Sequence, residues 1–434
     1  MEKLLRTCIE LAAKQGYAAQ GFAHHSLSTG CTFKTLTGET LTQNTLEKNI
    51  SFTIEKDGKK ASRKFSYDSG LKAEEIVESA ELLLGFVTAD PAESLPDISD
   101  AFESDISKFR ADELPEWAKK QYGAVKISLE EAIKTSEFEI GIESLIVSGS
   151  WDRSVFMNSF GAKKISASTY ASFQIGFSGD NDGIADAEWL YRDSDSLFAY
   201  DDAWTRICLR KIEDKIQPVT AKFETGIHTV AMSPELSGEC VGEILGFLSG
   251  YAIVEHMSPF SKAEIGAKIL PEWISVQSFH ALPGASSAQF FDGNGITTRD
   301  ISPIQNGELR ELFLSKASAE RLGLVPNGQP GPVNVRISGT PPVTDLRGVK
   351  FLFTTLAGMH TIDSATGNFA LEGEGYEVTE DGAVGKFVKN IGLSGNLRTL
   401  FGGLVGHLGD TPDYGSVRIP TLIFSAAQVT PTVA

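Results

Sequence analysis

Two carboxylates, Glu239 and Glu243, are the residues of this sequence whose type and spacing best suit chemistry. They stand four positions apart in a segment that we expect to be helical, so they share one face of the helix. Two carboxylates on one face can carry out acid–base catalysis or hold a hard cation. The alternative is that Glu243 is solvated or paired with an arginine and that neither residue is catalytic. We favour this alternative.

Metal binding would require more than these two residues. A catalytic zinc ion takes about three ligands from imidazole, thiolate or carboxylate groups and keeps one position open for water. Gly238 has no side chain, and the seven histidines show neither His-x-x-x-His nor His-Glu-x-x-His spacing. Asp180 and Asp182 are followed too early by Gly183 to form a calcium loop of the EF-hand type. The sequence therefore predicts no metal ion and no cofactor.

The helix that would carry the carboxylates has a clear start. Ser233 is suited to cap a helix and Pro234 to its first position, so we expect a helix from Pro234 to about Gly250. The many glycines after residue 221 are typical of a β-rich domain with tight turns.

The preceding part of the chain divides at an acidic, proline-rich stretch, residues 89–96. Apolar periodicity predicts helices and strands on both sides of it. The expected helices are 2–15, 72–87, 116–135 and 200–214, and the expected strands are 50–54, 62–66, 140–148, 155–158, 164–177 and 185–192. We therefore predict an α+β protein: an α/β N-terminal domain (1–90), a hairpin-containing middle domain (97–220) and a β-rich C-terminal domain (221–434).

Composition narrows the classes of partner. The formal net charge is -18, with 57 acidic and 39 basic residues, which disfavours direct binding to nucleic acid. No apolar run reaches the length of a membrane span, and the first residues lack the apolar core of a signal peptide. We therefore expect a cytoplasmic protein without a membrane partner. The four cysteines have no C-x-x-C spacing, and we expect reduced thiols in the core.

The residues around the two carboxylates resemble those of a known family. The stretch from Leu236 to Gly246, followed by Ser-Pro-Phe-Ser-Lys-Ala-Glu-Ile-Gly at 258–266, resembles the TldD/PmbA family, historically named modulators of DNA gyrase. Short motifs recur in the family's order at Asn158–Gly161, Asp292–Gly295 and Asn306–Leu309. The resemblance spans most of the chain and is dense after about residue 225.

The resemblance implies that the family's zinc ligands are missing. Metal-bearing TldD-type members carry His-Glu-x-x-x-His in this helix, where Gly238 and Glu243 replace the two histidines and Glu239 is retained. The family's third ligand is a cysteine before a glycine near the C-terminus, and Tyr414 takes that place. This pattern resembles the PmbA/TldE branch, the half of the pair without a metal site.

On this resemblance we expect a non-catalytic subunit of a TldD/TldE-type metalloprotease complex. Its partner would be a metal-bearing TldD-type chain, and its substrates would be peptide precursors or unfolded small proteins. One alternative is a regulatory or binding protein linked to gyrase or to a toxin–antitoxin system. Another is an autonomous hydrolase with Glu239 as general base and Glu243 as a ligand.

We also expect a homodimer of the isolated chain, because paired family members share a fold and a surface that docks a partner can dock a copy. The apolar segment Leu400–Val405 is our candidate for that surface. The alternative, that these residues belong to the core, remains open from the sequence.

Overall fold

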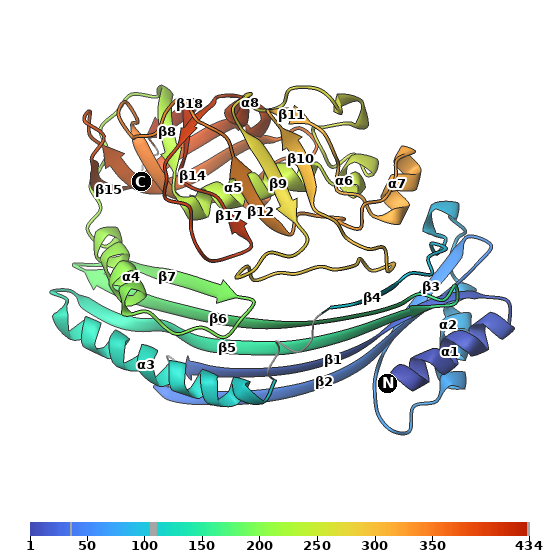
Figure 1. Cartoon of the computed structure of the whole chain (residues 1–434). Coiled ribbons are helices and arrows are strands. Elements are labelled where there is room, and N and C mark those ends of the chain that lie inside the picture. Colours follow the sequence, from blue (N-terminus) through green and yellow to red (C-terminus); the bar gives the residue numbers. More distant parts are fainter. Residues whose placement is uncertain (35–36, 105–110, 432–434) are drawn as a thin grey trace.

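The computed structural model describes residues 1–34, 37–104 and 111–431, and it has two layers (Figure 1). One layer is a long, curved sheet that bears helices at both of its ends. The other layer is the C-terminal part of the chain, which lies over one face of that sheet. The mixture of helices and strands confirms the predicted α+β class.

The long sheet is mostly antiparallel and runs in the order β3-β2-β1-β5-β6-β4, with β7 also paired to β6. Its hairpins turn where the sequence places Asp-Gly pairs: Asp57 and Gly58 have φ angles of 52° and 75°, and Asp182 and Gly183 have 53° and 85°. The strands are β1 (Ala18–Lys34), β2 (Glu39–Lys56), β3 (Lys59–Ser66), β4 (Ala101–Glu103), β5 (Glu139–Asn158), β6 (Lys163–Asn181) and β7 (Ile184–Ser194).

This sheet crosses the domain boundary that we expected near residues 90–97. Strand β1 pairs along most of its length with β5, for example Phe22 with Phe156. Residues 1–90 and 97–220 therefore contribute to one hydrogen-bonded sheet, although the proposed limits of 1–90, 97–220 and 221–434 stay predictions.

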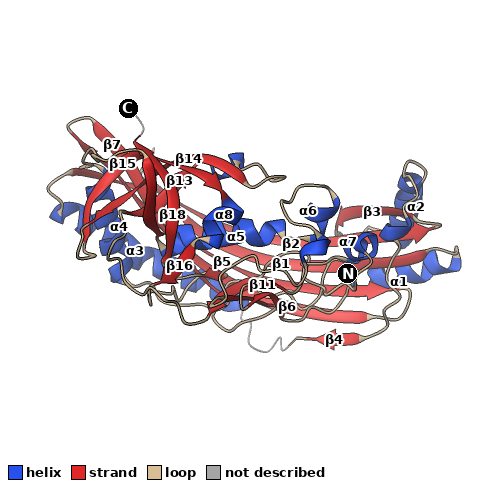
Figure 2. Cartoon of the chain, turned by 90° about the horizontal axis from the view of Figure 1, so that it is seen from above, coloured by secondary structure: helices blue, strands red, loops and turns tan. Residues whose placement is uncertain are grey.

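Four helices pack at the two ends of the sheet, as Figure 2 shows from above. Helices α1 (Glu2–Lys14) and α2 (Ala73–Leu84) cover one end, and α3 (Leu114–Thr135) and α4 (Asp202–Lys215) cover the other. Each end has its own apolar core, the first around Leu5, Ile50 and Phe52 and the second around Phe173 and Phe177. All four helices lie close to where their apolar periodicity predicts them.

Two expected elements differ from the structure. Strand β5 is continuous where we predicted two strands, because residues 149–154 stay paired with both β1 and β6. The helix expected to reach Gly250 is broken into α5 (Pro234–Phe247) and α6 (Gly250–Val254). The break occurs where the Gly250 N–H bonds the Phe313 carbonyl at 2.7 Å, so a tertiary contact ends the first helix.

The C-terminal part contains two further sheets. One has the order β11-β10-β9-β12-β17, and the other has the order β15-β14-β13-β8-β18-β16 and is closed by a β15–β18 pairing. The strands are β8 (Gly226–Met232), β9 (Ser275–Phe279), β10 (Ile301–Gln305), β11 (Glu308–Leu309), β12 (Asn334–Ser338), β13 (Phe351–Ala357), β14 (Asn368–Val378), β15 (Val384–Asn396), β16 (Leu404–His407), β17 (Val417–Arg418) and β18 (Leu422–Pro431), with helices α7 (Lys316–Leu322) and α8 (Leu397–Gly402).

Helix α5 packs in the core that both of these sheets share. The segment that we expected to form a dimer surface lies in the same core: Leu400, Phe401 and Leu404 are 5%, 2% and 2% exposed. That expectation was wrong for these residues, because α8 turns its apolar side chains inward against β18, where Phe401 meets the ring of Phe424.

The two layers meet at a loop that carries one of the resemblance motifs, residues 290–295. Asp292 is buried and accepts hydrogen bonds from the backbone N–H groups of Asn294 (2.8 Å) and Ile296 (2.9 Å). Gly295 has a φ angle of 77° and sits so close to Phe156 of the long sheet that a β-carbon there would lie 2.2 Å from the ring. Only glycine therefore fits this position.

A buried cation lies beside the same loop. Lys164 on β6 is 0% exposed, and its ammonium group lies 2.7 Å from Asp100 and 2.6 Å from the hydroxyl of Thr297. Thr297 in turn donates to Asp100 at 2.9 Å. This contact ties the C-terminal part to the beginning of β6.

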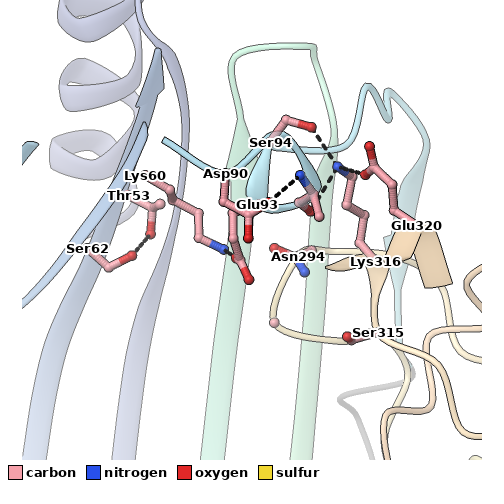
Figure 3. A network of polar contacts seen from close by, with 12 residues as sticks. Thr53, Lys60, Ser62, Asp90, Glu93, Ser94, Asn294, Ser315, Lys316 and Glu320 are labelled. Carbon is pink, nitrogen blue, oxygen red and sulfur yellow. Dashed lines mark hydrogen bonds and ion pairs between the residues drawn. The ribbon is translucent and has the colours of Figure 1, made fainter. Parts of the chain in front are cut away.

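A second polar contact joins the layers at the end of the sheet near α2. Figure 3 shows Lys316 of α7 directed at Ser94 and Glu320, while Lys60 of β3 is directed at Glu93. Arg321 of the same helix pairs with Asp90. The acidic, proline-rich stretch that we read as a domain boundary thus serves as the docking segment for α7.

The four cysteines are free and buried, which confirms the expected core thiols. Burial raises the pKa of Cys8, Cys208 and Cys240 to about 12, so these thiols stay protonated. In the part of the chain that the structure describes, no helix is both long and apolar enough to cross a membrane.

Candidate functional site

A cavity of about 460 Å³ lies between the two layers, at the end of the sheet that carries α3 and α4. Strand β7 and helix α4 supply one wall, and α5, β13 and the segment leading into β17 supply the other. Its charged lining consists of Glu188, Arg192, Asp193, Lys211, Lys215, Glu235 and Glu239, and Tyr414 lies among them.

Helix α5 brings its carboxylates to this cavity for local reasons. The Ser233 hydroxyl accepts a bond from the Leu236 N–H at 3.5 Å, and Pro234 follows it at the first helical position. One face of the helix is buried in the core, which leaves a stripe of carboxylates on the other face at i, i+4 spacing. The stripe consists of Glu235, Glu239 and Glu243.

Tyr414 is held by the first carboxylate of the stripe. Its hydroxyl donates to Glu235 Oε1 at 2.7 Å, and the Arg192 guanidinium lies 3.5 Å from the centre of its ring. Burial and the charge of Glu235 raise the pKa of the Tyr414 phenol. Burial would also raise the pKa of Glu235, but Lys211, the Tyr414 hydroxyl and Arg192 outweigh it and hold that pKa below its usual range. Tyr414 is therefore a neutral hydrogen-bond donor to an ionised carboxylate.

Glu239 has a different environment one turn along the helix. It lines the cavity, yet it forms no hydrogen bond or ion pair with any residue that the structure describes. Glu239 is exposed to solvent at one side, yet its partial burial, followed by the charges of Glu235 and Glu243, raises its pKa. An unpaired carboxylate in a cavity is an acceptor that is open to a ligand.

A second carboxylate of the cavity lacks a partner for one of its oxygens. Asp193 on β7 is 9% exposed, and its Oδ1 accepts no hydrogen bond within the described part of the chain. Burial raises its pKa, although the Ser286 hydroxyl, the Gly415 backbone N–H and the charges of Arg418 and Arg192 oppose that shift.

The cations of the lining already have partners. Lys215 lies 3.0 Å from Glu188 and 2.7 Å from Glu374, and Lys211 lies 3.7 Å from Glu188. Burial lowers the pKa of Lys215, but the two carboxylates outweigh it, so the pKa is raised and the group is charged. Arg192 stacks on Tyr414 and donates to the Tyr191 carbonyl at 2.7 Å.

The structure brings together only some of the residues that the sequence singles out. Glu239 and Tyr414 line the same cavity, although 175 positions separate them in the chain. A β-carbon on Gly238 would point at Val417, 3.5 Å away. Glu243 lies one turn farther along α5 and is not part of the cavity lining.

Sequence reasoning missed Glu235, Arg192 and Asp193. Glu235 could have been found, because it precedes Glu239 by four positions and extends the same helical stripe. Arg192 and Asp193 carry no comparable signal, since they lie in an alternating strand more than 40 residues upstream and reach α5 only through the packing of the layers.

The three positions at which the family's resemblance implies zinc ligands do not fit a zinc ion here. Gly238 offers no donor atom, Glu243 lies outside the cavity that holds Tyr414, and the Tyr414 phenol is engaged with Glu235. Among residues 1–34, 37–104 and 111–431, no three His, Cys, Asp or Glu side chains converge closely enough to hold a metal ion. We therefore derive no chemical step through a metal bound by this chain.

Comparison with known sequences shows what the C-terminal part resembles. Residues 225–431 match the profile of the PmbA/TldA metallopeptidase C-terminal domain. The chain is 28% identical over 204 residues to the metalloprotease PmbA of Escherichia coli O157:H7. That match covers 46% of this chain and 44% of the relative, so it spans less than half of the relative's length.

Solved structures share the whole fold. A modulator of DNA gyrase from Thermotoga maritima superposes with a TM-score of 0.85 at 18% identity, over 99% of this chain and 100% of the other. TldE from Thermococcus kodakarensis superposes with a TM-score of 0.81 at 16% identity, over 99% of each chain. The expected resemblance to the TldD/PmbA family is confirmed by the match of residues 225–431 to the profile of its metallopeptidase C-terminal domain, and the solved structures show that the fold is shared.

Proposed function

We propose that this chain is a PmbA/TldE-like, non-catalytic subunit of a TldD/TldE-type metalloprotease that cleaves peptides. In the cell it would act in the cytoplasm, paired with a metal-bearing TldD-type chain. One observation carries the proposal: α5 is intact and faces an interlayer cavity, while Gly238 and Tyr414 stand at two of the ligand positions without a zinc-binding group.

The chemistry of Glu239 supports the same conclusion. In metal-dependent peptide hydrolysis a glutamate base takes a proton from a water molecule that the metal has made acidic. The ligand positions around Glu239 offer neither imidazole nor thiolate, so this glutamate has no activated water to act on. The cavity itself persists and is large enough to hold part of a peptide.

The decisive experiment compares the chain alone with the chain plus a TldD-type chain of the same organism that has His-Glu-x-x-x-His intact. We expect no cleavage of an unfolded protein or of peptides by the chain alone, and chelator-sensitive cleavage after the two are mixed. Stoichiometric zinc and chelator-sensitive cleavage by the isolated chain would overturn the proposal. Failure of the two chains to co-purify would favour the regulatory alternative.

An autonomous hydrolase is the second candidate, and one observation favours it. The raised pKa of Glu239, unpaired in a cavity, is typical of a general base. If the isolated chain cleaves peptides without sensitivity to chelators and Glu239→Gln abolishes that cleavage, this candidate replaces the first.

We also propose that the isolated chain forms a homodimer, through a surface other than the segment Leu400–Val405. Because Leu400 and Phe401 are core residues, a dimer contact must use other parts of the surface. Light scattering tests it: the chain has a mass of 46.8 kDa, so a measured mass near that value would exclude the dimer at the concentration used.

A further inference from the structure

We propose that the interlayer cavity binds basic groups of a peptide, a primary ammonium or a guanidinium, with Glu239 as counter-ion and Asp193 Oδ1 as a buried acceptor. The proposal rests on the proposed function only in taking a peptide as the carrier of the basic group. The site itself is argued from the charges, the burial and the rings of the cavity.

The charges of the lining do not cancel. Four carboxylates (Glu188, Asp193, Glu235 and Glu239) face three cations (Arg192, Lys211 and Lys215), a formal excess of one negative charge. Lys211 and Lys215 are ion-paired with Glu188, and Arg192 lies on the ring of Tyr414. Glu239 has no partner among the described residues and is exposed to solvent, so a cationic ligand that enters the cavity can reach it and pair with it.

Asp193, on a different element, also offers an acceptor to a ligand. It lies on β7 rather than on α5, and it is 9% exposed. The Ser286 hydroxyl and the Gly415 N–H lie beside its carboxyl group, yet Oδ1 has no hydrogen-bond donor at bonding distance among the described residues. A buried acceptor without a donor destabilises the protein, and a ligand N–H would supply the missing hydrogen bond. Glu239 and Asp193 Oδ1 are therefore both acceptors without a donor, and a cationic ligand with N–H groups can bind to both.

Aromatic rings complete the cavity. Trp189 and Tyr191 of β7 line it and are 49% and 46% exposed, and Tyr376 and Phe387 line it from the C-terminal part. Aromatic faces attract cations and pack against the aliphatic stems of lysine and arginine. A volume of about 460 Å³ suits a small ligand or a peptide side chain rather than a folded domain.

The opposite ligand, an anion, fits the cavity poorly. To bind it, Lys215 would have to leave Glu188 at 3.0 Å or Glu374 at 2.7 Å. Glu239 would then face the anion as a like charge.

Calorimetric titration of the purified chain tests the proposal with three capped pentapeptides, Ala-Ala-X-Ala-Ala, in which X is lysine, norleucine or glutamate. We expect the lysine peptide to bind at least tenfold more tightly than the norleucine peptide, and the glutamate peptide to bind least. Glu239→Gln should raise the dissociation constant of the lysine peptide at least about tenfold, the change expected when a charge-assisted hydrogen bond is lost. Asp193→Asn should also weaken it.

Glu243→Gln is the matched control, because it removes the same group from the same helix outside the cavity lining; we expect less than a twofold change. Equal binding of the lysine and norleucine peptides, or an unchanged affinity in Glu239→Gln, would overturn the inference. Unfolding midpoints of the variants show that each is folded. Because no partner chain and no cleavage enter this titration, its failure leaves the pairing experiment standing, and the converse also holds.

Discussion

Among the regions that join the C-terminal part to the long sheet, the loop 290–295 and the cavity beside α4 differ in how completely their polar groups are paired. At the loop 290–295, Lys164 is fully buried and is held by Asp100 and Thr297, and Gly295 fits against Phe156 with no space for a β-carbon. At the cavity beside α4, Glu239 has no partner among the described residues and Asp193 keeps an unmatched oxygen.

This difference in pairing indicates that the loop 290–295 stabilises the fold, whereas the cavity beside α4 is open to a ligand. Close packing and paired charges are what a structural contact requires. Unpaired carboxylates in a cavity lower stability, and they are retained where binding or chemistry uses them. The loop contact is therefore expected to respond to substitution with large losses of stability, and the cavity with small ones.

The largest effect is expected at Asp100. Asp100→Ala leaves the buried Lys164 ammonium with only the Thr297 hydroxyl, and because the Asp100 side chain is 54% exposed, the loss should stay near the lower limit for a broken buried pair, a fall of about 2–3 kcal/mol in the free energy of unfolding. Urea denaturation measures it. The double variant Asp100→Ala/Lys164→Met removes the buried charge and should recover most of the loss. A double variant no more stable than Asp100→Ala would show that the ion pair is not what holds this contact.

The next effect is expected at Gly295. Gly295→Ala introduces a β-carbon 2.2 Å from Phe156 at a φ angle of 77°, so it should lower the free energy of unfolding by about 2 kcal/mol. Gly293→Ala in the same loop is the control, because its β-carbon would meet no atom within 4 Å. Equal losses in the two variants would contradict the packing argument.

At the cavity, Tyr414→Phe removes the 2.7 Å hydrogen bond to Glu235 and should cost about 1 kcal/mol, well below the loss at Asp100. The measurement is again urea denaturation, with the exposed Tyr191→Phe of the same cavity as control. A loss as large as that of Asp100→Ala would remove the distinction between the two regions.

Gly238→Ala, unlike the preceding variants, is expected to raise the stability of the protein. The new β-carbon would lie 3.5 Å from Val417, an ordinary contact, and alanine favours a helix over glycine by about 1 kcal/mol. We therefore expect a stabilisation of up to about 1 kcal/mol, measured as a rise in the unfolding midpoint. Gly242→Ala, with no atom near its β-carbon, should give a similar gain. A loss in Gly238→Ala alone would indicate that Val417 cannot accommodate the methyl group.

The smallest effect concerns Glu239 and depends on pH. The fold raises the pKa of Glu239, so folding favours the protonated carboxyl group. The stabilisation that comes from this protonation is fully present below the unfolded-state pKa of about 4.3 and is lost as the pH rises through the folded-state pKa. Glu239→Gln should therefore be more stable than the wild type at pH 7, by roughly 0.5 kcal/mol or less after solvent screening. Thermal melts of both proteins at pH 7 and pH 4 measure this stability difference. A difference between Glu239→Gln and the wild type that is larger at pH 4 than at pH 7 would contradict the prediction.

Several features of this chain were predictable from local sequence because short-range physics decides them. Ser233 and Pro234 begin α5 where capping requires, and the turns at Asp57-Gly58 and Asp182-Gly183 adopt the left-handed φ angles that such pairs favour. The i, i+4 spacing of Glu239 and Glu243 put both on one helical stripe. The motifs around α5 likewise indicated from residues alone the family resemblance that the profile match of residues 225–431 supports.

Other features depend on contacts between distant segments. The pairing of β1 with β5 joins residues on both sides of the acidic stretch into one sheet, and no local pattern encodes a strand's partner. Periodicity marks Leu400 and Phe401 as apolar but cannot tell a core from a docking surface, which is decided by what packs against α8. Arg192 and Asp193 join Glu239 and Tyr414 in one cavity because the two layers pack there, and only the tertiary structure brings their charges within reach of one another.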